Sequence, residues 1–305
     1  MTFKGKSIIS IRDLEREEID YIIQKAIDVK NNLYPNALKD KRLTTLFFEP
    51  STRTRLSFES AMVSLGGKFF SVTDTTNSSV QKGETLKDTI KTISGYTDVI
   101  VIRHKIDGAA RAATDVTSIP IINAGDGTNQ HPTQTLLDLY TINDEFKTID
   151  NLNIGILGDL KYGRTTHSLV MALSHYNVKI FLISSEILRM PDHFKTYLQN
   201  KNVKFYEVDS LSDIGKKLDF LYVTRIQRER FADPQEYEVV AHSYRITKDT
   251  LSILNPKIKI MHPLPRVDEI AYEVDKTENA IYFKQAHNGI PVRQAILGLL
   301  TGAIE

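Results

Sequence analysis

Hydroxyl and basic side chains interrupt an apolar stretch in the segment FFEPSTRTRLSFESA, residues 47–61. The apolar residues after this interruption have the i, i+3, i+4, i+7 spacing of one helix face: Phe58, Ala61, Met62 and Leu65. The sequence therefore predicts a helix that begins near Thr52. Arg53 and Arg55 fall in its first turn, where the helix dipole and the free N–H groups make cations unfavourable. A bound anion would remove that penalty, so we expect an anion site here rather than a plain cap formed by Ser51 or Thr52.

Arginine also recurs where other predicted strands end. Arg103 ends the run DVIVIR, Arg164 follows GILGDLKYG, and Arg225 ends FLYVTR. In a parallel α/β sheet, ligands bind outside the carboxyl ends of the strands. One arginine after a strand is usually a solvated loop residue. Together with Arg53, these residues favour a cleft lined for small, multiply charged anions.

Two histidines lie at predicted turns next to proline. His131 opens a helix in NQHPTQTLLDLY, where Asn129 and Gln134 add polar groups, and a neutral imidazole there could donate a hydrogen bond to a developing oxyanion. His262 lies in IMHPLPR, whose prolines leave carbonyl oxygens exposed for an amine. A rigid turn after a strand explains that second segment equally well. Neither histidine has a partner at metal-ligand spacing, so we expect no metal.

Nucleotide cofactors are not expected either. The glycines of GILGDLKYG have the spacing G-x-x-G-x-x-x-x-G, which differs from the dinucleotide pattern G-x-G-x-x-G, and the sequence has no Walker A pattern. The 305 residues carry a net charge of +1, which gives no broad field for nucleic acid or an anionic membrane. There is no cysteine, and no uncharged apolar run approaches the ~18 residues of a membrane span. We expect a soluble cytoplasmic protein.

Strand-like and helical segments alternate along the chain, which predicts parallel sheets covered on both faces. The strand-like runs are TTLFF, KFFSV, DVIVI, IPIIN, NIGIL, KIFLIS, VKFYEV, FLYVT and IKIM. We predict an α/β protein of two doubly wound parallel-sheet domains, with the active site in the cleft between them. The predicted domains span 1–133 and 134–287, and a helix over 288–305 packs back on the first.

Seven segments, in order and over nearly the whole chain, resemble the signatures of the aspartate carbamoyltransferase family. They are FEPSTRTRLSFE, KGET, HPTQ, GDLKYGRTTHS, TRIQRER, HPLPRVDEI and NGIPVRQA. STRTR marks the wider carbamoyltransferase group, whereas TRIQRER and HPLPRVDEI are the aspartate-specific parts. Ornithine-specific relatives carry a cysteine in an H-C-L-P segment and an S-M-G element, and this sequence has neither.

The resemblance implies transfer of a carbamoyl group from carbamoyl phosphate to the amine of L-aspartate, an early step of de novo pyrimidine biosynthesis. It also implies a first domain for carbamoyl phosphate, a second for aspartate, and a homotrimer with shared active sites. Phosphate would be held by Ser51, Thr52, Arg53, Thr54 and Arg103. The carbamoyl group would be surrounded by Thr54, Arg103, His131 and Gln134. Aspartate would be bound by Arg164, Arg225, Gln227 and the carbonyl groups of Leu264 and Pro265.

Ser78 and Lys82 match a loop that reaches into the neighbouring subunit's site in this family. The residues expected to take part in catalysis are Arg53, Thr54, Lys82, Arg103 and His131. Two other functions stay open: a carbamoyltransferase for another amine such as ornithine, and a non-catalytic anion-binding subunit. The sequence also leaves open whether a regulatory chain joins a larger assembly.

Overall fold

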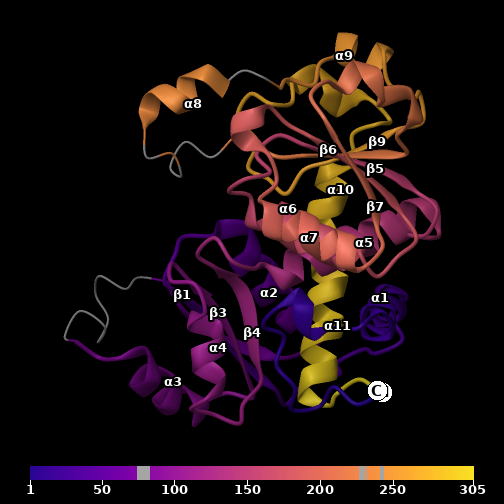
Figure 1. Ribbon diagram of the computed structural model, residues 1–305. Helices are drawn as coiled ribbons and strands as arrows, with labels where there is room; N and C mark the ends of the chain where they lie inside the picture. Colours follow the sequence, from indigo (N-terminus) through magenta and orange to yellow (C-terminus); the bar gives the residue numbers. More distant parts are fainter. Residues whose placement is uncertain (74–82, 227–230, 232, 241–243) are drawn as a thin grey trace. The chain divides into compact units, whose positions relative to one another are not determined.

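The computed structural model describes residues 1–73, 83–226, 231, 233–240 and 244–305, apart from the side chains at 234, 236 and 239. The chain forms two compact units (Figure 1). Unit 1 consists of Met1–Tyr140 and Asn288–Glu305, and unit 2 consists of Thr141–His287. The sequence predicts the first boundary at residue 133, whereas the units divide at 140. Both positions lie in the helix α5 (Pro132–Phe146).

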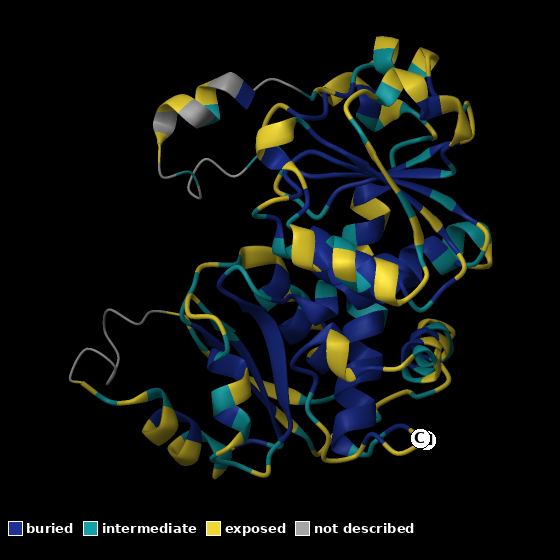
Figure 2. Cartoon of the chain, viewed as in Figure 1, coloured by how far each residue is buried: buried dark blue, intermediate teal, exposed yellow. Residues whose placement is uncertain are grey.

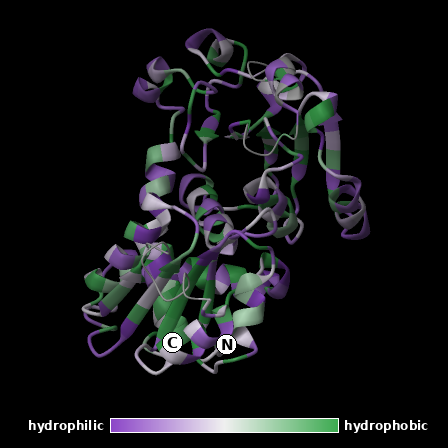
Figure 3. Cartoon of the chain, turned by 90° about the vertical axis from the view of Figure 1, so that its left-hand side faces the viewer, coloured by the Kyte–Doolittle hydropathy of each residue, from purple (hydrophilic) through white to green (hydrophobic). Residues whose placement is uncertain are grey.

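Unit 1 is built on a four-stranded parallel sheet with the order β2-β1-β3-β4. Its strands are β1 (Arg42–Phe47), β2 (Lys68–Val72), β3 (Val99–His104) and β4 (Ile121–Asp126). The outer edge of β4 is covered, because Ile8 bridges Ile122 in parallel. β2 forms the opposite edge, and its residues are mostly exposed. The strands β3 and β4 are mostly buried (Figure 2). Figure 3 shows the hydrophobic residues of unit 1 concentrated in its sheet.

Helices pack on the sheet of unit 1 and on one another. They are α1 (Arg16–Lys30), α2 (Thr52–Ser64), α3 (Leu86–Ser94), α4 (Ala109–Thr114), the first part of α5, and α11 (Gly289–Thr301). α1 begins with a capping box between Glu15 and Glu18 and buries one face rich in isoleucine. α11 is apolar on nearly every side, and it packs against both α1 and α2. The end of the chain therefore completes the core of unit 1.

Unit 2 is built on a five-stranded parallel sheet with the order β7-β6-β5-β8-β9. Its strands are β5 (Asn153–Leu157), β6 (Lys179–Ile183), β7 (Lys204–Val208), β8 (Phe220–Val223) and β9 (Lys259–Met261). Its helices include α6 (Arg164–Leu173), α7 (Asp192–Asn200), α8 (Pro234–Val240), α9 (Lys248–Ser252) and α10 (Tyr282–His287). A cluster of buried side chains fills one face of the sheet, with Leu221, Ile260 and Tyr282 among its members.

The fold class predicted from the sequence is confirmed. Both sheets are parallel, and their strands alternate with helices along the chain. Each of the nine strand-like runs forms a strand in the part of the chain that the structure describes. In each sheet the chain reverses its direction of winding once, between β1 and β3 in unit 1 and between β5 and β8 in unit 2. These two switch points are where ligands bind in open α/β sheets.

Candidate active site

The switch point of unit 1 brings Arg103 beside the segment that precedes α2. β1 and β3 are neighbours, with Phe47 in register with Arg103. The next N–H, that of Phe48, donates to the carbonyl oxygen of Arg103 over 2.9 Å. The chain then turns through Glu49 and Ser51 into α2. The start of α2 and the end of β3 therefore share one edge of the sheet.

The N-terminus of α2 has no acidic residue in its first turn. Ser51 is the N-cap residue, and its backbone is extended, with φ −159° and ψ 99°, but its side chain makes no capping hydrogen bond. The plain-cap explanation of this hydroxyl group is therefore wrong. Backbone N–H groups at such a helix end, uncompensated by a carboxylate, favour an anion. Thr54 follows in the same turn and is buried.

The two arginines of the first turn have different environments. Arg55 donates to Oε1 of Glu59 over 3.2 Å, one turn later in α2. Glu59 is buried and also accepts from the hydroxyl of Thr45 in β1. Arg55 is thus part of the helix's own packing. Arg53 is exposed, forms no ion pair with a described carboxylate, and has its pKa lowered by partial desolvation. Of these two arginines, it is therefore Arg53 whose guanidinium is available to bind a ligand.

Arg103 is largely buried, and its guanidinium joins two loops at the switch point. Nη2 donates to Oε1 of Glu49 over 3.0 Å, and Nη1 donates to the carbonyl oxygen of Ala124 over 3.3 Å. The sequence did not indicate Glu49 as a functional residue, although it lies within the FEPSTRTR segment. Its carboxylate fixes the direction of Arg103 at the edge where an anion would bind.

A buried aspartate orders the loop that leads to His131. Asp126 ends β4 and accepts from the side chains of Asn123 (2.8 Å) and Asn129 (3.0 Å) and from the N–H groups of Gln130 (3.1 Å) and Gly108 (2.8 Å). The sequence placed Asn129 among the polar groups of the helix start. Its side chain instead donates to Asp126 within the loop. The Gly-rich run NAGDGTN was the available sequence signal for such a loop.

His131 directly precedes α5 and is buried, with 4% of its surface exposed. Its carbonyl oxygen accepts the N–H groups of Gln134 (3.0 Å) and Thr135 (3.2 Å) and so starts the helix. The side chain of Gln134 donates to Oδ1 of Asp138 over 2.9 Å. Asp138 was not predicted, although its i, i+4 spacing from Gln134 is visible in the sequence. This contact holds the amide of Gln134 in a fixed orientation.

The switch point of unit 2 depends on a close approach between β5 and β8. Gly158 follows β5 with φ 118°, and a Cβ there would lie 2.4 Å from the carbonyl oxygen of Thr224. Thr224 follows β8, and its hydroxyl accepts the N–H of Asp159 over 3.1 Å. The close approach of these two strands therefore requires glycine at position 158, and no bound dinucleotide is needed to explain it. Arg225 follows Thr224 at this edge, and Arg164 begins α6 beyond the same loop.

The segment HPLPRVDEI follows β9 and forms a turn. Leu264 has φ 54°, an unusual value for a residue with a Cβ, and its N–H donates to Nδ1 of His262 over 2.8 Å. The bond between Leu264 and Pro265 is cis. Three predicted site residues, Ser78, Lys82 and Gln227, lie outside the described residues.

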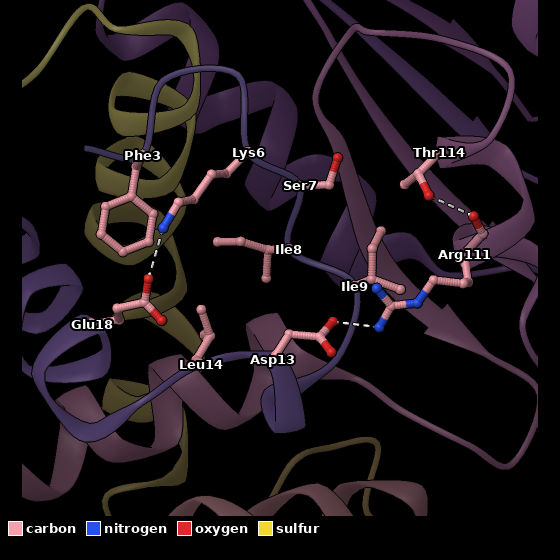
Figure 4. A pocket seen from close by; sticks show the side chains of 10 residues that line it. All are labelled: Phe3, Lys6, Ser7, Ile8, Ile9, Asp13, Leu14, Glu18, Arg111 and Thr114. Carbon is pink, nitrogen blue, oxygen red and sulfur yellow. Dashed lines mark hydrogen bonds and ion pairs between the residues drawn. The ribbon is translucent and has the colours of Figure 1, made fainter. Parts of the chain in front are cut away.

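A pocket of about 350 Å³ opens elsewhere on unit 1, between the N-terminal segment and α4 (Figure 4). Its cations are already neutralised, because Lys6 pairs with Glu18 at 2.9 Å and Arg111 pairs with Asp13. None of the predicted site residues lines it. Within the described ranges there is also no group of three or more His, Asp or Glu side chains able to hold a metal ion. No helix described in the structure has the length and apolar character needed to cross a membrane.

Comparisons with known proteins agree with this arrangement. Residues 6–144 match the family model "Aspartate/ornithine carbamoyltransferase, carbamoyl-P binding domain", and residues 150–300 match the model for the "Asp/Orn binding domain". The aspartate carbamoyltransferase catalytic subunit of Thermococcus kodakarensis is 55% identical over 308 residues, covering 100% of this chain and 99% of its own. That of Methanocaldococcus jannaschii is 54% identical, with 96% of each chain covered.

Solved structures agree as well. The catalytic subunit of M. jannaschii aspartate transcarbamoylase superposes with a TM-score of 0.90 at 54% identity, over 96% of both chains. Aspartate transcarbamoylase of Trypanosoma cruzi, solved with carbamoyl aspartate and phosphate, superposes with a TM-score of 0.92 at 38% identity, over 98% of this chain and 97% of the other. The chain therefore belongs to the aspartate/ornithine carbamoyltransferase family.

Proposed function

We propose that this chain transfers the carbamoyl group of carbamoyl phosphate to the amine of L-aspartate, giving N-carbamoyl-L-aspartate and phosphate in de novo pyrimidine biosynthesis. The observation that carries this function is the start of α2, where Arg53 has no described carboxylate partner and Ser51 makes no capping hydrogen bond. Phosphate fits such a helix end because N–H groups, hydroxyls and a guanidinium can all donate to it.

Residues of unit 1 are assigned to carbamoyl phosphate. Ser51, Thr52, Arg53 and Thr54 bind the phosphate group at the N-terminus of α2, and Arg103 reaches it from β3. His131 and Gln134 bind the carbamoyl group from the start of α5. In this assignment the first domain covers residues 1–133, with residues 288–305 packed on it, and Gln134 reaches the carbamoyl group from just beyond the boundary.

The chemical step needs positioning and charge stabilisation more than a strong base. The amine nitrogen of aspartate attacks the carbamoyl carbon, the new C–N bond forms, and the oxygen of that carbon becomes an oxyanion. Arg103, His131 and Thr54 donate hydrogen bonds to it. The C–O bond to phosphate then breaks, and the departing phosphate takes the amine proton. Holding two anionic substrates side by side supplies much of the remaining rate enhancement.

Residues of the second domain, 134–287, are assigned to aspartate. Arg164 and Arg225 flank the switch point of unit 2 and pair with the two carboxylates, and Gln227 assists them. The carbonyl oxygens of Leu264 and Pro265 accept from the amine. Guanidinium groups suit carboxylates because they donate two parallel hydrogen bonds.

We further propose a homotrimer in the cytoplasm whose active sites are shared between subunits, with Ser78 and Lys82 donated by the neighbour. The open edge of unit 1 supports a second copy there. Phe69 and Phe70 of β2 are 39% and 53% exposed, and Leu56 and Val63 of α2 are 49% and 54% exposed. Exposed apolar side chains on and beside an edge strand favour pairing with another chain. Whether a regulatory chain also binds is a separate question, which co-purification from the native cell answers.

The substrate assignment is tested by comparing amines in one assay. The purified chain is incubated with carbamoyl phosphate labelled at the carbamoyl carbon and with either L-aspartate or L-ornithine. The expected result is labelled N-carbamoyl-L-aspartate and an equal amount of phosphate with aspartate alone. Labelled citrulline would instead indicate the ornithine enzyme, and binding of carbamoyl phosphate without any product would indicate an anion-binding subunit.

A further inference from the structure

A buried histidine and a buried glutamate enclose the turn that carries Leu264 and Pro265. His262 is 1% exposed and Glu269 is 6% exposed. Nε2 of His262 lies 2.6 Å from Oε1 of Glu269. Both residues belong to unit 2, and the chain between them forms the turn after β9. Burial of an ionisable pair is costly unless every polar atom has a hydrogen-bond partner.

The hydrogen bonds of His262 define where its proton lies. The N–H of Leu264 donates to Nδ1 over 2.8 Å, so Nδ1 is an acceptor and carries no proton. The proton of the neutral ring is then on Nε2, which donates to Glu269. The backbone N–H of His262 donates to Oε1 of Gln285 in α10 over 2.8 Å, which anchors the start of the turn.

Glu269 holds the end of the turn with its other oxygen. Oε2 accepts the N–H groups of Val267 over 2.9 Å and Asp268 over 3.1 Å. Burial raises the pKa of this carboxyl, but the hydrogen bonds from His262 and the backbone outweigh it, so the pKa of Glu269 is lowered. The group is therefore a carboxylate that fixes the proton of His262 on Nε2 and leaves Nδ1 free to accept.

The acceptor at Nδ1 matters because Leu264 has an unfavourable backbone. Its φ of 54° lies in the left-handed region, which costs energy for a residue with a branched side chain. The hydrogen bond from its N–H to His262 holds this conformation. Without this acceptor the partly buried N–H of Leu264 would lose its hydrogen bond, and the turn would relax toward a commoner conformation. The carbonyl groups of Leu264 and Pro265 would then change direction.

We propose that His262 and Glu269 are positioning residues for the second substrate: Glu269 fixes the imidazole so that Nδ1 holds the Leu264 N–H, and the turn thereby presents two carbonyl oxygens to the amine of aspartate. This inference rests on the proposed function, because it assigns the two carbonyl groups to that amine. It adds that the binding geometry depends on one nitrogen atom of His262.

Two substitutions of His262 separate the two ring nitrogens. In His262→Asn the amide oxygen takes the place of Nδ1 and can still accept from Leu264. In His262→Gln the longer amide reaches Glu269 but leaves no acceptor at the Nδ1 position. The control is Asn279→Ala, which removes hydrogen bonds to the carbonyl oxygens of Pro256 and Ile258 in the same unit and leaves the turn intact.

The experiment measures KM for aspartate and for carbamoyl phosphate in the full-length enzyme, together with the unfolding midpoint. We expect His262→Gln to raise KM for aspartate about tenfold or more, and His262→Asn to raise it less than about threefold. KM for carbamoyl phosphate should stay unchanged in both, and Asn279→Ala should lower the unfolding midpoint without changing either KM. Equal effects of Asn and Gln on KM for aspartate would overturn the proposal, as would an equal rise in both KM values.

The wild-type enzyme provides a readout that does not depend on the folding of variants. Nitrogen-15 NMR of the labelled histidines should find a resonance of a neutral ring with its proton on Nε2 and an accepting Nδ1, shifted when aspartate binds. A neutral ring protonated on Nδ1 at His262 would overturn the proposal. If the wild-type enzyme makes no carbamoyl aspartate, the proposed function fails. If it does and His262→Gln keeps its KM for aspartate, this inference alone fails.

Discussion

Arg103 and Glu49 form an ion pair of 3.0 Å at the switch point of unit 1, and the same guanidinium donates to the carbonyl oxygen of Ala124. A planar group with several donors is needed to keep both contacts and still face a substrate. Arg103→Lys should therefore lower kcat by about 10²–10³, because an ammonium cannot hold that geometry while donating to the oxyanion. Steady-state kinetics with both substrates varied measure this loss. Turnover within a few-fold of wild type would remove Arg103 from the catalytic group.

Arg225→Ala should raise KM for aspartate by about tenfold or more and leave KM for carbamoyl phosphate nearly unchanged. Its guanidinium is assigned to a carboxylate of aspartate, and a desolvated carboxylate without a partner costs more than the lost hydrogen bond. The measurement is a pair of saturation curves, one for each substrate. Equal damage to both KM values would contradict the division of the two substrates between the domains.

Asp275 contributes stability that depends on pH. The hydrogen bond from Arg266 lowers the pKa of Asp275 below its ordinary value of 3.8, and Tyr282 also donates to this carboxylate. Because the pKa is lower in the folded state, the stabilisation is complete above 3.8 and is lost as the pH falls through the folded pKa. Asp275→Asn should therefore lower the urea midpoint of unfolding at pH 7 and differ less from wild type as the pH falls below 3.8. A difference that is constant down to pH 3 would contradict this origin of the stability.

Lys82 should act in the site of the neighbouring subunit. Arg53→Ala and Lys82→Ala chains, each nearly inactive, are dissociated and reassembled in equal amounts. In every hybrid trimer, one of the three sites joins an intact Arg53 to an intact Lys82. Random mixing makes about three-quarters of the trimers hybrids, so about a quarter of wild-type activity should return. Reassembly of each variant alone is the control. An inactive mixture, with hybrids demonstrated by native mass spectrometry, would mean that Lys82 serves its own chain or no site.

The sequence predicted those parts of the structure that depend on local pattern. The start of α2 at Thr52 follows from helical spacing, and the strand ends before Arg103 and Arg225 follow from apolar runs. The pair of Arg55 and Glu59 was also visible as an i, i+4 spacing, and it explains an arginine that the anion site does not need.

Contacts between distant segments were not predictable. The ion pair of Arg103 with Glu49 joins residues 54 positions apart, and Gly158 meets Thr224 from another strand. His262 and Glu269 are only seven positions apart, but they face each other across a turn that has no periodicity. Such contacts depend on the register of the sheets and on loop conformation, and propensity carries no information about either.

Binding of the phosphate group at the start of α2 is tested by comparing Arg53 with Arg55, two arginines in the first turn of the helix. The rate of N-carbamoyl-L-aspartate formation is measured for wild type, Arg53→Ala and Arg55→Ala, with unfolding midpoints recorded alongside. Arg53→Ala should abolish nearly all turnover and leave the midpoint unchanged, because this exposed side chain has no described ion-pair partner. Arg55→Ala should keep turnover within a few-fold and lose about 1–3 kcal/mol of stability, because it leaves buried Glu59 without its cation. Wild-type kinetics for Arg53→Ala would contradict a phosphate site at this helix end.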